Sequence, residues 1–73
     1  MKFCWKMISQ LFDENGDLDL EEYEETFTDF NKAVDSFTNE VKYNEDLAIC
    51  FVFTYIGNKL YSDKPVLSFR LLP

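Results

Sequence analysis

Apolar residues recur at spacings of three and four through the middle of the chain. They are Leu20, Tyr23, Phe27, Phe30, Val34, Phe37 and Val41. Because side chains three and four apart share a helix face, this spacing predicts one apolar stripe on a helix over residues 20–43. Asp19 has the side chain of a helix N-cap, and Glu22 completes a capping box three residues later. Asn44 is expected to end the helix in a left-handed conformation.

The first twelve residues carry two periodicities at once. Met1, Cys4, Trp5, Ile8, Leu11 and Phe12 fall at helical spacing. Phe3, Trp5 and Met7 also alternate, as the residues of a half-buried strand do. We predict a short amphipathic helix here, and a strand is the alternative.

Three runs rich in aromatic and β-branched residues make up the last part of the chain. They are LAICFVFTYI at 47–56, KLYS at 59–62 and VLSFRLLP at 66–73, separated by Gly57-Asn58 and by DKP at 63–65. Runs of this kind, bounded by turn residues, are typical of strands joined by hairpins. The predicted fold class is α+β, with a short N-terminal helix, a long amphipathic helix and then a three-stranded antiparallel β-meander packed on the long helix. Residues 1–73 are expected to form a single domain.

The run at 47–56 is apolar on both faces of a strand. Leu47, Ile49, Phe51, Phe53 and Tyr55 point one way, and Ala48, Cys50, Val52, Thr54 and Ile56 point the other. The long helix can cover only one of these faces. The other is expected to be covered by the first helix, in a fully buried strand, or to form a contact with another subunit. The small size of the chain favours a homodimer.

Charge is distributed very unevenly along the chain. The formal net charge is −7, and residues 13–29 hold nine carboxylates with no Lys or Arg. Proteins that bind nucleic acids or anionic membranes use Lys and Arg, so the composition argues against both as direct partners. A concentrated negative field instead steers association with a basic partner.

Few residues of this chain could carry enzyme chemistry. The sequence has no His, and its only glycines, Gly16 and Gly57, form no phosphate-binding loop. Neighbouring carboxylates lie on a predicted solvated face, without a pocket that would separate their proton affinities. We predict that the protein is not an enzyme and uses no cofactor.

The two cysteines and the apolar runs bear on the cellular setting. Cys4 and Cys50 lie in apolar stretches, where free thiols behave as small hydrophobic residues, although a single disulfide between them stays open. The longest apolar run, at 47–56, is about half the length of a membrane span. A reducing, cytoplasmic location is expected.

Residues 13–25, DENGDLDLEEYEE, resemble the calcium-binding loop and exit helix of the EF-hand family. Read without a gap, the ligand positions of that loop fall on Asp13, Asn15, Asp17, Asp19, Glu21 and Glu24. Leu18 stands at the sixth position, where the family uses Gly for its positive φ. If the predicted helix start is aligned with that of the family instead, Asp19 takes the ninth and Glu22 the twelfth loop position. The loop is then two residues shorter than the family's loop. The resemblance implies a calcium site, and these departures predict weak or no calcium binding, with a simple turn around Asn15-Gly16. We therefore assign no metal ligand.

On the predicted helix, the carboxylates from Glu21 to Asp29 span about 12 Å. Five carboxylates over this length place one negative charge every ~2.5 to 3 Å along the helix axis. This linear charge density is not far from that of a DNA duplex, which has one phosphate per ~1.7 Å of its axis. Carboxylates four residues apart on a helix repel each other. A need for solubility alone does not explain a helix face that carries this repulsion. In size, acidity and lack of catalytic groups the chain resembles phage-encoded DNA-mimic inhibitors of nucleases, polymerases or sliding clamps.

That resemblance implies a basic DNA-binding protein of the host as the partner. The residues expected to bind it are Asp13, Glu14, Asp17, Asp19, Glu21, Glu22, Glu24, Glu25 and Asp29. The alternatives are an immunity protein against a nuclease toxin, a degenerate EF-hand-like calcium-binding module, and an acidic accessory subunit.

Overall fold

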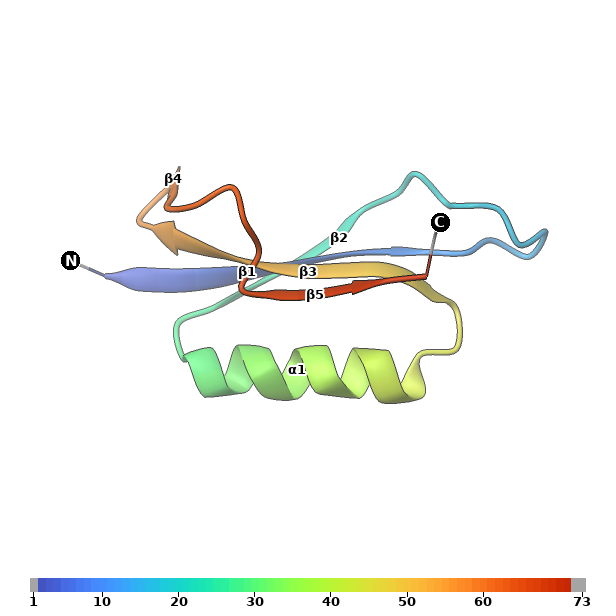
Figure 1. The fold of residues 1–73 in the computed structure, drawn as a ribbon, viewed down its shortest axis with the longest axis horizontal. Coiled ribbons are helices and arrows are strands. Elements are labelled where there is room, and N and C mark those ends of the chain that lie inside the picture. The colour runs from blue at the N-terminus through green and yellow to red at the C-terminus, as the bar shows by residue number, and fades with distance from the viewer. Residues whose placement is uncertain (1, 72–73) are drawn as a thin grey trace.

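The computed structural model of the protein describes residues 2–71, which form five antiparallel strands and one helix (Figure 1). In chain order these are β1 (Phe3–Leu11), β2 (Tyr23–Phe27), α1 (Phe30–Tyr43), β3 (Leu47–Ile56), β4 (Lys59–Leu60) and β5 (Leu67–Arg70). The predicted fold class is therefore wrong, because the domain is dominated by its sheet. Met1, Leu72 and Pro73, which the patterns assigned to the first helix and the last strand, lie outside the described residues.

The sheet has the strand order β2-β1-β3-β4, and β5 also pairs with β3. β4 pairs with the end of β3 at Tyr55 and Ile56, whereas β5 pairs with residues 49–52 of the same strand. β4 and β5 thus follow each other along one edge of β3. In the predicted meander the last strand would instead have paired with the strand just before it.

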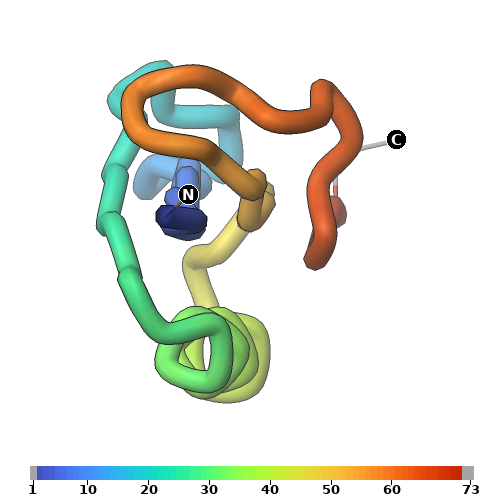
Figure 2. Tube along the Cα trace, turned by 90° about the vertical axis from the view of Figure 1, so that its left-hand side faces the viewer, coloured from blue at the N-terminus to red at the C-terminus, as the bar shows by residue number. Residues whose placement is uncertain are grey.

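The helix and the long loops lie on opposite sides of this sheet. α1 runs along one face (Figure 1), and the end-on view shows segments 12–22 and 57–66 on the other side (Figure 2). Each sheet face therefore has a different cover. We call them the helix face and the open face.

The N-terminal segment is the strand β1, so the predicted first helix is wrong and the alternative is correct. β1 lies between β2 and β3 and pairs with both of them. The alternation of Trp5, Met7 and Ser9 places these side chains on the helix face, with Met7 opposite Val52 and Ser9 opposite Cys50. Backbone pairing on two sides outweighs the helical spacing of the same residues.

The predicted long helix is wrong over residues 20–29. Residues 23–27 form β2, and α1 begins only at Phe30. Thr26 and Phe27 favour a strand, while the repulsion of Glu21 by Glu25 and of Glu25 by Asp29 weakens a helix. A helix and a strand both suit the apolar residues Tyr23 and Phe27 here, and pairing with β1 decides between them.

The N-cap of the helix is Asp29. Its backbone is extended, with φ −118° and ψ 120°, and its carboxylate Oδ1 accepts a hydrogen bond of 2.9 Å from the Asn31 N–H. Asp19 and Glu22, the predicted capping box, precede β2 instead. The helix ends at Tyr43 as predicted, but Asn44 is extended, with φ −91°, and is not left-handed.

We expect Asp29→Ala to lower the free energy of unfolding by about 1 kcal/mol, because the first turn loses an acceptor for its free N–H groups. Glu22→Ala is the matched control and should change stability by less than about 0.5 kcal/mol, as an exposed substitution does. Urea unfolding followed by circular dichroism measures both. Equal losses in the two variants would contradict Asp29 as the cap.

The core lies between α1 and the helix face. Its buried apolar residues are Met7, Ala33, Leu47, Cys50 and Val52, with Trp5, Leu11, Phe27, Phe37, Val41, Leu67 and Phe69 packed around them. Ala33 is 0% exposed and is the residue of α1 that is buried in this core. Cys4 and Cys50 are free thiols on opposite faces, so the alternative of a disulfide between them is not realised.

A β-bulge changes the direction of Leu47. Strict alternation places Leu47 on the same face as Ile49, but the register of β1 and β3 shifts between Gln10 and Leu11, and Leu11 lies opposite Leu47. Ala48 is therefore an extra residue on β3, and a bulge of this kind re-aims a side chain. Leu47 consequently joins Cys50 in the core and is 1% exposed.

The open face carries the apolar residues of β3 that α1 does not cover. Ile49, Phe51, Phe53 and Tyr55 are only half-buried there, together with Ile8 of β1. No helix among residues 2–71 covers them, because the described chain has α1 alone, on the other face. The homodimer expected from this surplus stays a prediction.

Candidate functional site

The nine carboxylates of residues 13–29 lie in one stretch of the chain that includes the edge strand β2, and we call this stretch the acidic edge. They come from the loop after β1, the edge strand β2 and the N-cap of α1. Within residues 2–71, β2 pairs only with β1, so its other side is open to a partner. All nine are exposed except Asp19, which is half-buried.

The loop forms the predicted turn around Asn15-Gly16. The Asp13 carboxylate accepts hydrogen bonds of 2.9 Å from the N–H groups of Asn15 and Asp17, and Gly16 has φ 81°. The Asp13 N–H donates to the Asp17 carbonyl at 2.7 Å and closes the loop. The Asp13 carboxylate therefore stabilises the turn through these hydrogen bonds. The side chains of Glu14 and Asp17 are exposed to solvent.

The segment between the turn and β2 contains three more carboxylates, those of Asp19, Glu21 and Glu22. Asp19 Oδ1 accepts a 3.0 Å hydrogen bond from the Glu21 N–H, and the Tyr23 hydroxyl donates to Glu21 Oε2 at 3.4 Å. The Glu21 carboxylate raises the pKa of the Tyr23 phenol, because its charge disfavours the phenolate, and burial adds to the shift. Glu22 lies beside them, exposed.

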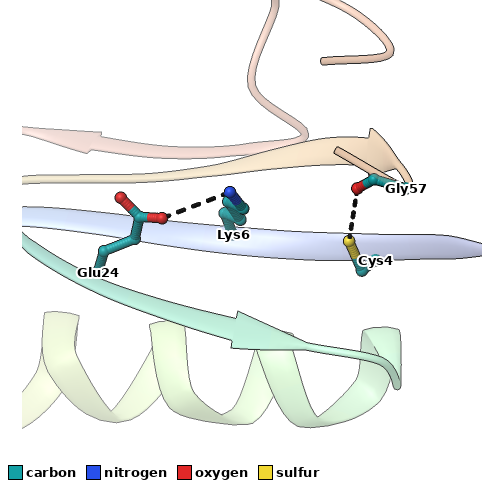
Figure 3. A network of polar contacts seen from close by, with 4 residues as sticks. All are labelled: Cys4, Lys6, Glu24 and Gly57. Carbon is teal, nitrogen blue, oxygen red and sulfur yellow. Dashed lines mark hydrogen bonds and ion pairs between the residues drawn. The ribbon is translucent and has the colours of Figure 1, made fainter. Parts of the chain in front are cut away.

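On β2 the side chains of Glu24 and Glu25 point to opposite faces. Glu24 lies opposite Ile8 on the open face, and its Oε1 is 3.5 Å from Lys6 Nζ (Figure 3). Lys6 Nζ also lies 4.5 Å from the centre of the Tyr55 ring. Glu25 lies opposite Met7 on the helix face. The expectation of one carboxylate face on a helix is therefore wrong, because a strand alternates its side chains.

No protein family, curated protein or solved structure matches this chain. The arrangement of its own residues is therefore what indicates a function.

On the other side of the sheet, β4 contains Lys59 and β5 contains Arg70, while Asp63 and Lys64 lie in the segment between these strands. Outside residues 13–29, the sequence has only five carboxylates against all seven of its Lys and Arg. Negative charge is thus concentrated in one stretch of the chain. Lys6–Glu24 is the only ion pair within residues 2–71, so the other carboxylates of the acidic edge lack a cationic partner there.

The geometry of the EF-hand family is missing from residues 13–25. Glu24 lies in a strand rather than at the start of an exit helix. Oδ1 of Asp13 is occupied by backbone N–H groups, and Oε1 of Glu24 is paired with Lys6. Among the described residues, no group of three or more His, Cys, Asp or Glu is placed to hold a metal ion.

A cavity beside the acidic edge was not predicted from the sequence. Its lining residues are Met7, Ser9, Tyr23, Glu24, Glu25 and Glu40. Ser9 and Glu40 were not candidates, since they are far apart in the sequence and meet only when α1 packs on the sheet. The one local signal was Ser9 itself, a polar residue in the apolar alternation Trp5, Met7, Leu11.

α1 is the single helix of the described chain, and it is neither long nor apolar enough to cross a membrane.

Proposed function

We propose that this protein binds a basic DNA-binding protein and inhibits it by occupying its DNA site with the acidic edge. The class it resembles implies a target in the host cytoplasm, such as a nuclease, a polymerase or a sliding clamp. The observation that carries the proposal is the concentration of nine carboxylates in residues 13–29, a stretch without Lys or Arg in which only Glu24 has a cationic partner, Lys6 of β1. A surface that served only solubility would intersperse both signs of charge.

The spacing of the charges supports the proposal in a form different from the helix first expected. An extended strand rises about 3.3 Å per residue and turns successive side chains to opposite faces, so carboxylates on one face recur about every 6.6 Å, close to every second phosphate of one DNA strand at ~3.4 Å each. Glu21 and Glu22 precede β2, and Glu24 and Glu25 lie in it on opposite faces. We infer that carboxylates spaced in this way can follow a groove that accepts a phosphate backbone.

Capture from a bacterial lysate by the immobilised protein tests this function. We expect the retained protein to bind DNA and to be released by duplex DNA and by high salt, because screening weakens exposed charge contacts. Changing Glu14, Glu21 and Glu22 to Gln and Asp17 to Asn should abolish retention. These side chains are exposed and contribute no described bond to the fold beyond the Tyr23 contact with Glu21.

The matched control removes the same amount of charge elsewhere. Asp35→Asn, Glu45→Gln, Asp46→Asn and Asp63→Asn are exposed positions outside the acidic edge, and this variant should retain the partner. Retention that resists duplex DNA, or that both variants lose equally, would contradict DNA mimicry.

A further inference from the structure

β2 is an edge strand whose outer side is free. Within residues 2–71 it pairs only with β1, and in the end-on view no other segment lies further out on that side of the molecule (Figure 2). Its residues from Tyr23 to Thr26 are exposed, and the strand contains no Pro or Gly. An edge strand of this kind is a template onto which a further strand can pair.

The register of the sheet shows which way the backbone groups of β1 point. In antiparallel pairing, one residue exchanges hydrogen bonds with the strand on one side, and the next residue bonds to the strand on the other side. The Gly57 N–H donates to the Lys2 carbonyl at 3.4 Å. This pair continues the register of β1 with β3, in which Phe3 lies opposite Ile56. Even-numbered residues of β1 therefore bond to β3, and odd-numbered residues such as Met7 bond to β2.

Glu24 and Thr26 consequently present their backbone N–H and C=O groups to the outside. Met7 lies opposite Glu25, so the backbone of Glu25 faces β1 and the backbone of its two neighbours faces away. Apart from the β-ladders, no hydrogen bond within residues 2–71 uses the backbone of Glu24 or Thr26. Each residue offers one donor and one acceptor, which is the pattern that an added antiparallel strand satisfies.

Charge determines which strand suits this edge. Opposite charges across two paired strands attract, and like charges directly opposite each other destabilise the pair. Glu24 already has a cationic partner, Lys6, whereas Glu25 on the helix face has none within residues 2–71. A suitable strand therefore places a Lys or Arg opposite Glu25. A second Lys or Arg, two residues along, lies opposite the exposed ring of Tyr23, which also attracts cations.

The β2 strand of a second copy does not suit the same edge. If two copies of β2 paired about their centres, Glu25 of one would lie directly opposite Glu25 of the other, and these like charges repel. Each copy also has a formal net charge of −7, which opposes their approach. The edge therefore favours a basic strand from a different protein.

We propose that β2 receives an extended, basic segment of a protein partner as an added antiparallel strand. The backbone of that segment exchanges hydrogen bonds with Glu24 and Thr26, and its Lys or Arg side chains lie along the helix face, opposite Glu25 and Tyr23. In strand addition, backbone bonds give affinity and alternate side chains give specificity. That the segment belongs to a DNA-binding protein rests on the proposed function, whereas the pairing of the edge does not.

Titration of the full chain with the acetylated and amidated hexapeptide Thr-Val-Lys-Val-Lys-Thr, followed by NMR, tests the pairing. We expect saturable shifts of the amide resonances of residues 23–27. Hydrogen exchange of the Glu24 and Thr26 amides should become slower in the complex, because an added strand protects the outward N–H groups.

Two N-methylated forms of the peptide separate backbone pairing from charge attraction. When the Lys side chains lie opposite Glu25 and Tyr23, the N–H groups of both Val residues face β2. Methylation of these two nitrogens should therefore weaken binding by about tenfold or more. Methylation of both Lys backbone nitrogens keeps the charge and places the methyl groups on the outer side of the added strand. This control peptide should bind within about threefold of the parent peptide.

Substitutions in β2 test the same pairing from the side of the protein. Thr26→Pro removes an N–H that faces away from β1, a position at which edge strands tolerate Pro. It should weaken peptide binding by about fivefold or more, whereas the control Thr26→Val keeps the N–H and should bind within about twofold of the wild type. Glu25→Gln should weaken binding by about two- to fivefold, as the loss of one cross-strand charge pair does.

Three results would overturn the inference. They are shifts that do not saturate, equal binding of the two methylated peptides, and protection of the Glu24 and Thr26 amides that rises with protein concentration when no peptide is present. The last result would assign the edge to a second copy of the chain. A well-dispersed spectrum shows that each variant folds, and the two methylated peptides test the pairing on the wild-type protein.

Lysate capture distinguishes this inference from the proposed function. We expect Thr26→Pro to retain less of the partner than Thr26→Val does. If both variants retain a DNA-binding partner equally and the peptide does not bind, strand addition is overturned and the proposed function stands. If the peptide binds as expected but no DNA-binding protein is captured, the proposed function fails, and the added strand stands for a basic segment of another protein.

Discussion

Leu47→Ala is expected to lower the free energy of unfolding by about 2 to 5 kcal/mol, the range for a truncated core leucine. Leu47 is 1% exposed and packs with Cys50 and Val52 beneath α1. The loss combines the transfer free energy of the removed methyl groups with that of the cavity left behind. Equilibrium unfolding in urea, with the slope of the transition checked for constancy, gives the value.

Leu20→Ala is the matched control for this substitution. Leu20 heads the apolar stripe of the predicted long helix, but it is 81% exposed in the loop before β2. Its truncation should change stability by less than about 0.5 kcal/mol. A large loss at Leu20 together with a small loss at Leu47 would contradict both the β-bulge and the strand assignment of residues 23–27.

Raising the pH from about 9 to about 11 is expected to destabilise the protein through Cys50. Burial, with a smaller effect from the Glu40 carboxylate, raises the pKa of the Cys50 thiol from 9.0 to about 11. The folded state then holds this proton more tightly than the unfolded state does. The contribution of the protonated Cys50 thiol to the free energy of unfolding is fully present below pH 9 and is lost as the pH rises through 11. The expected loss is about 2 to 3 kcal/mol, from 1.36 kcal/mol per pKa unit.

Comparison with Cys50→Ala isolates this effect. The four tyrosines also titrate at alkaline pH, so the informative quantity is the difference between the two stability curves rather than either slope. Cys50→Ala should flatten the curve between pH 9 and 11, and Cys4→Ala, at the half-buried thiol on the open face, should leave it unchanged. Parallel curves for the wild type and Cys50→Ala would contradict the raised pKa.

Local patterns predicted the elements whose signals have only one interpretation. The aromatic and β-branched run at 47–56 is β3 with the same bounds, and Gly57, with φ 58°, makes the expected turn after it. The end of the helix at Tyr43 was also correct. These features depend on backbone propensity and turn chemistry, which act over a few neighbouring residues.

The segments with two compatible periodicities were assigned to the wrong structure. Residues 3–11 and 23–27 suit a helix stripe and a strand face equally well, and their partners lie far away in the chain. β1 pairs with β3 over a long separation in the sequence, as Phe3 does with Ile56. The propensities of neighbouring residues do not predict backbone pairing with a strand that is so distant in the chain.

The candidate site divides in the same way. The concentration of carboxylates in 13–29 is a property of composition, and the nine predicted residues lie in the segment after β1, in β2 and at the N-cap of α1. Their common helix face was wrong, because Glu24 and Glu25 alternate on a strand. The cavity was missed, since Ser9, Glu25 and Glu40 come from three separate elements.

By itself, the amino-acid sequence determined the charge, its segregation, the turns and the surplus of apolar residues in β3, because each follows from residue type and close neighbours. Only the tertiary structure decided that residues 23–27 form an edge strand, that Leu47 enters the core through a bulge, and that Glu40 and Ser9 line one cavity. The physical reason is that pairing and packing join residues distant in the chain. The free energy of those contacts outweighs local preferences that differ by less than about 1 kcal/mol per residue.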